Sequence, residues 1–255
     1  MTDAGASSAA GEAVRALGDP RAVPDRRWVE RLTGASPAQV DDVLAEASEL
    51  VPYDREIGEA HRAEGRASYA QIRSPLELYA LVRLTRPDHV VEAGVSSGVS
   101  SAHFLIGLRR NHHGTLHSID FPTFARGSTP SLRDSPVAIP RGKASGWAVP
   151  ERLRPGWDLR IGRSESLLPT LVAELPSIGV FLHDDLHTPA HLAFELGTIE
   201  PKLAPGAVVL ADNTVWTGRA FPRWAERLGV PWYRRRRSDL VGLRAQLGQS
   251  APPAT

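Results

Sequence analysis

Acidic and imidazole side chains recur at the ends of apolar runs along this 255-residue chain. Glu92 closes one such run, Asp120 closes the next, and residues 183–187 read His-Asp-Asp-Leu-His after a third. A later run ends in Asp212 and Asn213. Carboxylates can accept hydroxyl groups or hold cations, and a histidine can take up a proton near neutral pH. These residue types predict a polar ligand site with a proton acceptor, if the fold brings the ends of the runs together.

The loop after the first run reads Gly-Val-Ser-Ser-Gly at residues 94–98. A dinucleotide site requires Gly-x-Gly-x-x-Gly, so that backbone amides can approach a pyrophosphate, and Ser96 stands where the middle glycine is needed. Glu92 would repel a phosphate and favour a cationic ligand, whereas Asp120 suits the two vicinal hydroxyls of a ribose. A ligand with a ribose, a positive centre and no phosphate points to S-adenosylmethionine (SAM), and this pattern argues against a nicotinamide-dependent oxidoreductase. Taken singly, the glycine loop could serve only helix–strand packing, and Asp120 could be a turn residue.

The elements that must position these residues alternate between strands and helices. Apolar runs predict strands at residues 89–93, 115–119, 157–161, 178–183 and 207–211, with a final pair at 231–237 and 240–245. Helical periodicity and caps predict intervening helices, for example one opened by the capping box at residues 74–77. The expected fold is therefore α/β: a Rossmann-like doubly wound sheet, mostly parallel with an antiparallel C-terminal strand. In such sheets the ligand lies at the carboxyl ends of the strands.

The chain divides into four segments by composition and periodicity. We expect frayed tails at residues 1–20 and 249–255, an N-terminal helical cap at 21–73, and the α/β core at 74–248. Residues 122–156, which are rich in proline and lack periodicity, form a loop insertion in that core.

The amino-acid composition limits which binding partners and which cellular location we expect. The formal net charge is +1, so neither nucleic acid nor a membrane is an expected partner, and the run at residues 234–237 is interpreted as a solvated charge run on an edge strand. Cysteine is absent, which excludes disulfides and thiolate chemistry and fits a cytoplasmic protein. No signal peptide or membrane-spanning run is recognisable. The N-terminal helices could form a homodimer contact or a lid.

From about residue 69 to 245 the chain resembles the class I SAM-dependent methyltransferases, and most closely the branch that methylates small molecules. The resemblance depends on three stretches: residues 181–188 (Phe-Leu-His-Asp-Asp-Leu-His-Thr), 203–206 (Leu-Ala-Pro-Gly) and 210–213 (Leu-Ala-Asp-Asn). Residues 139–147 also resemble an insertion of that branch. Two positions depart from the pattern, since Pro189 stands where relatives often have tyrosine and Asn213 replaces a second aspartate.

The resemblance implies roles for individual residues. The methionine part of the cofactor would be held by Glu92, Gly94, Ser96, Ser97 and Gly98. The ribose would bind Asp120, the adenine would lie between Ser164 and Glu165, and Asp184 would lie near the sulfonium and the methionyl amine. The acceptor, a small hydroxylated molecule, would contact Tyr69, Trp147, Asp212 and Trp216.

The chemistry of transfer leaves alternatives open. We expect His187 to be the general base, with His183 and Asp184 as neighbouring catalytic candidates, although either histidine could simply hydrogen-bond its own loop. Residues 212–218 resemble the Asp-Asn-x-x-Trp-x-Gly stretch of metal-dependent catechol-type O-methyltransferases. That version would place Mg²⁺ or another divalent cation on Asp184 or Asp185, together with Asp212 and Asn213. A non-catalytic SAM-binding or scaffold protein is the alternative from another class.

Overall fold

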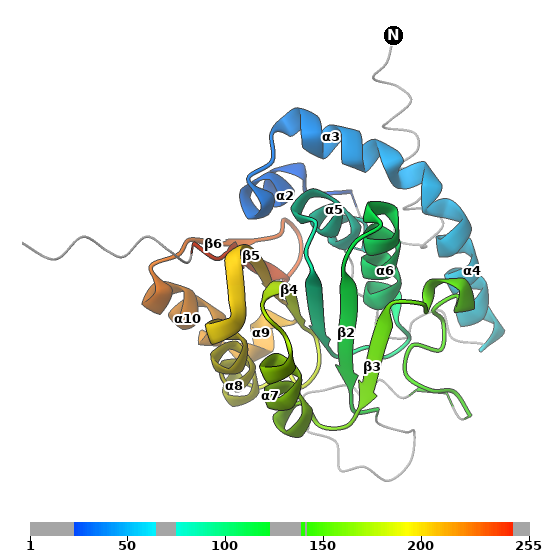
Figure 1. Ribbon diagram of the computed structural model, residues 1–255. Helices are drawn as coiled ribbons and strands as arrows, with labels where there is room; N and C mark the ends of the chain where they lie inside the picture. Colours follow the sequence, from blue (N-terminus) through cyan, green and yellow to red (C-terminus); the bar gives the residue numbers. More distant parts are fainter. Residues whose placement is uncertain (1–22, 65–74, 123–138, 141, 247–255) are drawn as a thin grey trace, which may run out of the picture.

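A seven-stranded sheet between two layers of helices forms the body of the protein in a computed structural model (Figure 1). The structure describes residues 23–64, 75–122, 139–140 and 142–246. Tyr69 and the two predicted tails lie outside these ranges. The strand order is β3-β2-β1-β4-β5-β7-β6. The order reverses between β1 and β4, which is where a doubly wound sheet opens a crevice for a ligand.

The first five strands are parallel, and the sixth and seventh provide the antiparallel edge. The expected fold class is therefore confirmed. The bounds are β1 His89–Ala93, β2 Thr115–Asp120, β3 Trp157–Ile161, β4 Ile178–His183, β5 Leu203–Ala211, β6 Trp232–Arg234 and β7 Val241–Arg244. Strand β6 is shorter than the predicted run, because the chain already turns at residues 235–240.

Apolar side chains cover both faces of the sheet, as successive strand residues point in opposite directions. Val90 belongs to one buried cluster and its neighbour Val91 to the other. The first cluster packs under α2 (Arg26–Thr33), α3 (Pro37–Ala45), α5 (Pro75–Thr85) and α6 (Val99–Asn111). The second packs under α7 (Ser164–Glu174), α8 (Pro189–Ile199) and α10 (Ala220–Leu228). Four short pieces and one longer helix complete the described elements: η1 Glu46–Glu49, η2 Glu151–Leu153, η3 Glu200–Lys202, α9 Thr214–Thr217 and α4 Val51–Ala63.

The N-terminal helices are joined to the C-terminal strands. The indole Nε1 of Trp28 donates a hydrogen bond of 3.0 Å to the carbonyl oxygen of Tyr233. Arg235, which is only 3% exposed, donates to the buried carboxylate of Glu77 over 2.7 Å. Interpreting residues 234–237 as wholly solvated was therefore wrong for Arg235, because a buried acid from a distant helix binds it.

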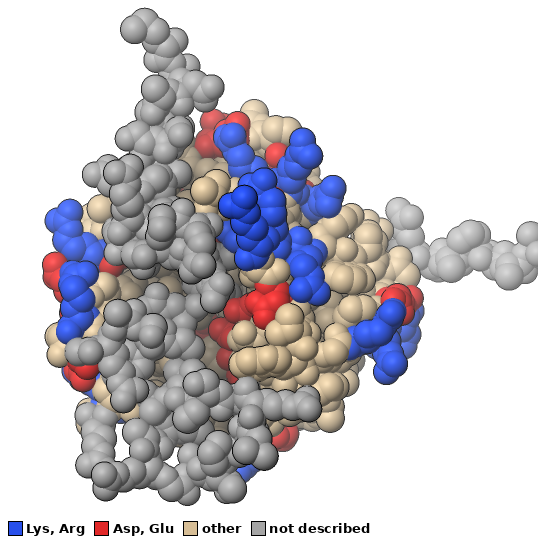
Figure 2. All heavy atoms as spheres, turned by 180° about the vertical axis from the view of Figure 1, so that it is seen from behind, with Lys and Arg blue, Asp and Glu red and all other residues tan. Residues whose placement is uncertain are grey.

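Charged side chains of both signs share the face opposite to that of Figure 1. Figure 2 shows Lys and Arg side chains next to a group of Asp and Glu side chains, so neither sign covers this face alone. Within the described ranges, no helix is long and apolar enough to cross a membrane.

Candidate active site

At two positions of the glycine loop between β1 and α6, the backbone has a conformation that only glycine adopts without strain. Gly94 and Gly98 both have φ of +92°. A Cβ on Gly94 would lie 2.1 Å from the carbonyl oxygen of Asp184, and one on Gly98 would lie 2.4 Å from Val149 Cγ2. The loop is therefore held between the end of β4 and the described part of the insertion, at the reversal of strand order.

Glu92 lies fully buried beneath this loop and accepts hydrogen bonds from three hydroxyl groups. Ser100, Ser101 and Ser118 donate to its carboxylate over 2.5, 2.6 and 2.7 Å. Burial, with a further contribution from the charge of Asp184, outweighs these hydroxyls and raises the pKa of Glu92 to about 7. The carboxylate thus ties α6 to β1 and β2, and a cationic ligand nearby would favour its ionised form.

Glu92→Gln is expected to flatten the pH dependence of stability. Because the pKa of Glu92 rises from 4.5 to about 7 on folding, the folded protein binds this proton more tightly. Stability is therefore lost as the pH rises through this window, by an amount on the order of 2 kcal/mol for a buried group. Urea unfolding of both proteins at pH 5 and pH 8 measures the difference. Parallel stability curves for the two proteins would contradict this account of Glu92.

Asp120 closes β2 directly beside the loop, and its side chain is buried. One carboxylate oxygen accepts the backbone N–H of Val95 over 3.2 Å, and the other accepts the hydroxyl of Ser145. Burial raises the pKa of Asp120, and these donors oppose the rise. Each oxygen keeps a further lone pair. Next to it, Phe121 is an exposed aromatic side chain that sequence reasoning did not single out.

The described part of the insertion packs on the loop rather than extending into solvent. Gly146 and Ala148 donate backbone hydrogen bonds of 2.8 and 3.0 Å to the carbonyl oxygens of Ser96 and Ser97. Trp147 stacks on His61 of α4, with ring centroids 4.9 Å apart. Sequence reasoning missed Ser145 and His61 because nothing local pairs them with Asp120 or Trp147. The only available signal was the resemblance of residues 139–147 to a family insertion.

Ser97 contributes an unusual hydroxyl to the same loop. It is fully buried, yet its Oγ makes no hydrogen bond to any part of the chain that the structure describes. A buried hydroxyl without a partner has a free-energy cost. A ligand in the loop would remove that cost.

His187 lies next to Asp184, in a group of polar side chains that follow β4 and β5. Its Nε2 is 3.4 Å from Asp184 Oδ1 and 3.1 Å from Asn213 Nδ2. Asp184 is fixed by its backbone N–H, which donates to the carbonyl oxygen of Ala93 over 2.8 Å. The ring of Trp216, 38% exposed, meets the His187 ring edge-on at 5.8 Å between centroids. The structure thus brings together an imidazole, a carboxylate and an exposed indole.

Asp212 adds a second titratable carboxyl to this group. Its backbone N–H donates to the carbonyl oxygen of His183 over 3.0 Å, which joins the ends of β4 and β5. Burial, and after it the charge of Asp184, raises the pKa of Asp212 to about 7. Asp212 can therefore exchange a proton near neutral pH.

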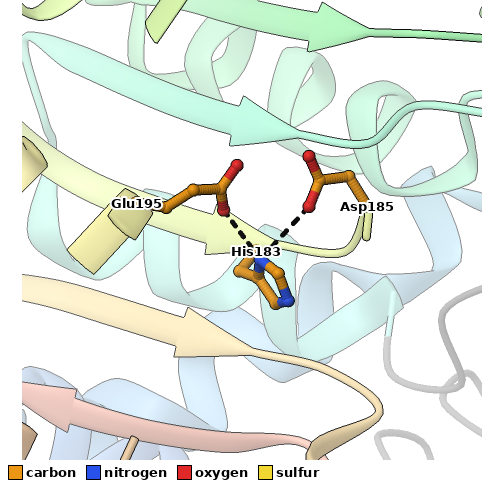
Figure 3. A group of neighbouring side chains, drawn as sticks. All are labelled: His183, Asp185 and Glu195. Carbon is orange, nitrogen blue, oxygen red and sulfur yellow. Dashed lines mark hydrogen bonds and ion pairs between the residues drawn. The ribbon is translucent and has the colours of Figure 1, made fainter. Parts of the chain in front are cut away.

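Other predicted site residues form a separate group between β4 and α7–α8. His183 is fully buried, and Asp185 faces His191 and Ser164 rather than Asp212. Glu165 lies 3.4 Å from His191. Of the two aspartates predicted as alternative cation ligands, Asp184 lies with Asp212 and Asn213, whereas Asp185 lies in the other group. Figure 3 shows the group around His183.

Comparisons with known proteins agree with this fold. Residues 91–214 match a protein family described as a methyltransferase domain. The fold is similar to that of the O-methyltransferase TomG from Streptomyces achromogenes, involved in tomaymycin synthesis and solved with SAM (20% identity, 76% of this chain and 88% of that chain, TM-score 0.53). It is also similar to an O-methyltransferase from Bacillus cereus in complex with SAH (16%, 85% and 99%, TM-score 0.55). No curated protein sequence matches the chain. At these identities the structural likeness shows the fold.

Proposed function

We propose that this chain, whose residues 91–214 match a methyltransferase domain, is a class I SAM-dependent methyltransferase that methylates a hydroxyl group of a small molecule. The observation that supports this most is the convergence of His187 and Asp184 beside the glycine loop, with 3.4 Å between Nε2 and Oδ1. A base next to a cofactor loop is what transfer to a hydroxyl requires. Two proteins of similar structure are O-methyltransferases, which favours the same reaction.

The cofactor would lie along the carboxyl ends of β2, β1 and β4. Asp120 would accept the ribose hydroxyls, and the loop at residues 94–98, with the buried hydroxyl of Ser97, would hold the methionine part. The backbone carbonyl of Asp184 lies against Gly94, and the carboxylate of the same residue would attract the sulfonium or the methionyl amine. Phe121, which follows Asp120 and is exposed, offers an apolar surface for the adenine.

The transfer itself would be an in-line displacement. The acceptor oxygen attacks the methyl carbon, a C–O bond forms, and the bond to sulfur breaks with its electron pair left on a neutral thioether. The hydroxyl proton passes to Nε2 of His187. The resulting imidazolium lies close to the carboxylate of Asp184, which favours the charged form. Holding nucleophile, methyl and sulfur in line is the main contribution of the protein.

The acceptor would enter beside Trp216 and Asp212. Trp216 is partly exposed and packs edge-on against His187, so it can form an aromatic wall for a ring-containing acceptor. Trp147, held by His61, borders the cofactor loop from the other side and can close over the pair of ligands. These contacts favour an acceptor that fits between the two indole rings. Assays with a panel of phenols and sugars identify the acceptor.

We further propose that transfer does not use the catechol-type cation. Asn213 presents its amide nitrogen, which cannot bind a metal ion, to Asp184 at 3.5 Å, and Asp185 points into the other group. Adding Mg²⁺ to the chelator-treated protein is therefore expected to leave kcat unchanged. The measurement is initial turnover at saturating SAM with increasing Mg²⁺. A severalfold rise that saturates with Mg²⁺ would restore the metal-dependent alternative.

Calorimetry followed by an acceptor panel tests the main proposal. Binding of SAM and SAH without binding of NADH is expected, together with release of SAH when a hydroxylated acceptor is methylated. Tight binding with no methylated product for any acceptor would favour the non-catalytic alternative. Failure to bind SAM would refute the proposal. A structure with SAH is expected to place the ribose on Asp120.

The near-neutral charge of +1 and the absence of cysteine favour a cytoplasmic enzyme that binds neither nucleic acid nor a membrane. A homodimer built with the N-terminal helices is open to measurement by size-exclusion chromatography with light scattering.

A further inference from the structure

Two histidines and two carboxylates form a closed ring between β4 and α8. His183 Nδ1 lies 2.7 Å from Glu195 Oε2 and 3.3 Å from Asp185 Oδ1. On the other side, His191 Nε2 lies 3.0 Å from Asp185 Oδ2 and 3.3 Å from Glu195 Oε1. Each carboxylate thus faces both imidazoles. Figure 3 shows the carboxylates of Asp185 and Glu195 converging on one edge of the His183 ring.

The ring is buried except for the partly buried Asp185, and it has unused acceptor capacity. Glu195 and His183 are both 0% exposed. Asp185 Oδ1 and Glu195 Oε1 are buried and accept no hydrogen bond from the residues that the structure describes. One fully buried and one partly buried carboxylate this close together need positive charge nearby, since an uncompensated buried charge is strongly unfavourable. Protonation of both histidines is one way to supply this charge, and a divalent cation is another.

The donor atoms have the spacing that a cation requires. One ligand atom each from His183, Asp185 and Glu195 lies within 4.8 Å of the other two. Bonds of about 2.1 Å in a tetrahedral arrangement would separate neighbouring donors by about 3.4 Å. The pair at 3.3 Å already matches this, and the pair at 2.7 Å would have to open by less than an ångström.

We propose that His183, Asp185 and Glu195 bind a divalent transition-metal ion of the zinc type, in a site separate from the methyl-transfer site. An imidazole nitrogen with two carboxylates suits Zn²⁺ better than Mg²⁺, which prefers oxygen ligands and retains water. His191 would not touch the ion. It would donate its Nε2–H to Asp185 and so orient this ligand, as residues that surround metal ligands commonly do. The proton on His183 Nδ1 leaves to solvent when the ion binds. The ion would fasten the end of β4 to α8.

Zinc binding to the full chain tests this site without any assay of methyl transfer. The protein is treated with EDTA, the chelator is removed, and ZnCl₂ is titrated by calorimetry at pH 7.5, with MgCl₂ in a parallel titration. We expect about one equivalent of zinc, little binding of magnesium, and a melting temperature that rises with zinc. Replacing Glu195 with glutamine keeps the shape of the side chain and removes one ligand. This change is expected to weaken zinc binding at least tenfold.

Two further variants locate the ion. Glu165→Gln is the matched control, because Glu165 also faces His191 but lies outside the proposed ligands. It is expected to keep the affinity for zinc. Asp212→Asn is likewise expected to bind zinc as the wild type does. Loss of zinc in Asp212→Asn, unchanged affinity in Glu195→Gln, or a wild type that binds no zinc would each overturn the proposal.

Variants that fail to fold do not prevent the test. Circular dichroism monitors each of them, and Asp185→Asn replaces Glu195→Gln if the latter is unfolded. X-ray absorption of the zinc-loaded wild type provides a readout that needs no variant. One imidazole and oxygen ligands are expected around the ion, and a set of two or more imidazoles would contradict the proposed ligands.

Discussion

His187→Gln is expected to lower kcat by about 10²–10⁴-fold, the usual contribution of a general base. The change removes the proton acceptor and keeps a side chain that can still pair with Asn213, which lies 3.1 Å from Nε2 in the wild type. The Kd for SAM is expected to stay within about twofold, because the glycine loop and Asp120 are unchanged. The measurements are kcat with the best acceptor of the panel and SAM affinity by calorimetry.

A surface histidine serves as the control for His187. His113, in the turn after α6, is partly exposed and lies 2.8 Å from Asp88, so His113→Gln is expected to retain full activity. The pH profile adds a second readout: the wild-type rate should rise with pH as the base loses its proton, and this rise should disappear in His187→Gln. If instead kcat is unchanged and Asp212→Asn removes the pH-dependent rise, Asp212 is the base.

Asp120→Ala is expected to weaken binding of SAM and SAH by about 1–3 kcal/mol, or roughly 5- to 150-fold. The carboxylate would no longer accept the ribose hydroxyls, and the N–H of Val95 and the hydroxyl of Ser145 would also lose their acceptor. The effect should therefore appear in the Kd and KM for SAM, whereas kcat at saturating SAM falls much less. Calorimetry and initial rates measure the two parts separately.

Asp120→Asn separates ribose binding from loop packing. Asparagine keeps one oxygen that can accept from Val95, but it lacks the second acceptor and the charge. An intermediate loss of affinity is expected. Asp88→Ala, which removes an exposed carboxylate in the turn before β1, is the control and should bind SAM normally. An Asp120→Ala protein that binds SAM as tightly as the wild type would exclude Asp120 as the ribose ligand.

Features that depend on short stretches of chain could be predicted from the sequence. The strands at residues 89–93, 157–161 and 178–183 were predicted with the bounds that the structure has, because each is an apolar run between turn residues. The glycine loop was also predictable, since positive φ at Gly94 and Gly98 is a local requirement that only glycine meets readily. The four-residue helix α9 escaped prediction because it is too short to show periodicity.

Side-chain directions and contacts between distant parts of the chain were decided by the tertiary structure. Asp184 and Asp185 are adjacent in sequence and chemically identical, yet one faces His187 and the other His191. Their directions follow from the path of the chain as it leaves β4, and the partners come from other elements. Arg235 is likewise one of four consecutive arginines, and only the position of Glu77 on α5 makes it a buried one.

The sequence by itself determined that this protein has a doubly wound sheet with polar residues at the carboxyl ends of its strands, because apolar periodicity and turn chemistry are local. It also determined the candidate cofactor loop and the candidate base. Only the tertiary structure decided how these residues divide into two groups. Burial and pairing depend on which side chains meet across the sheet, and residues 12 or more positions apart, such as His183 and Glu195, meet only when the chain is folded.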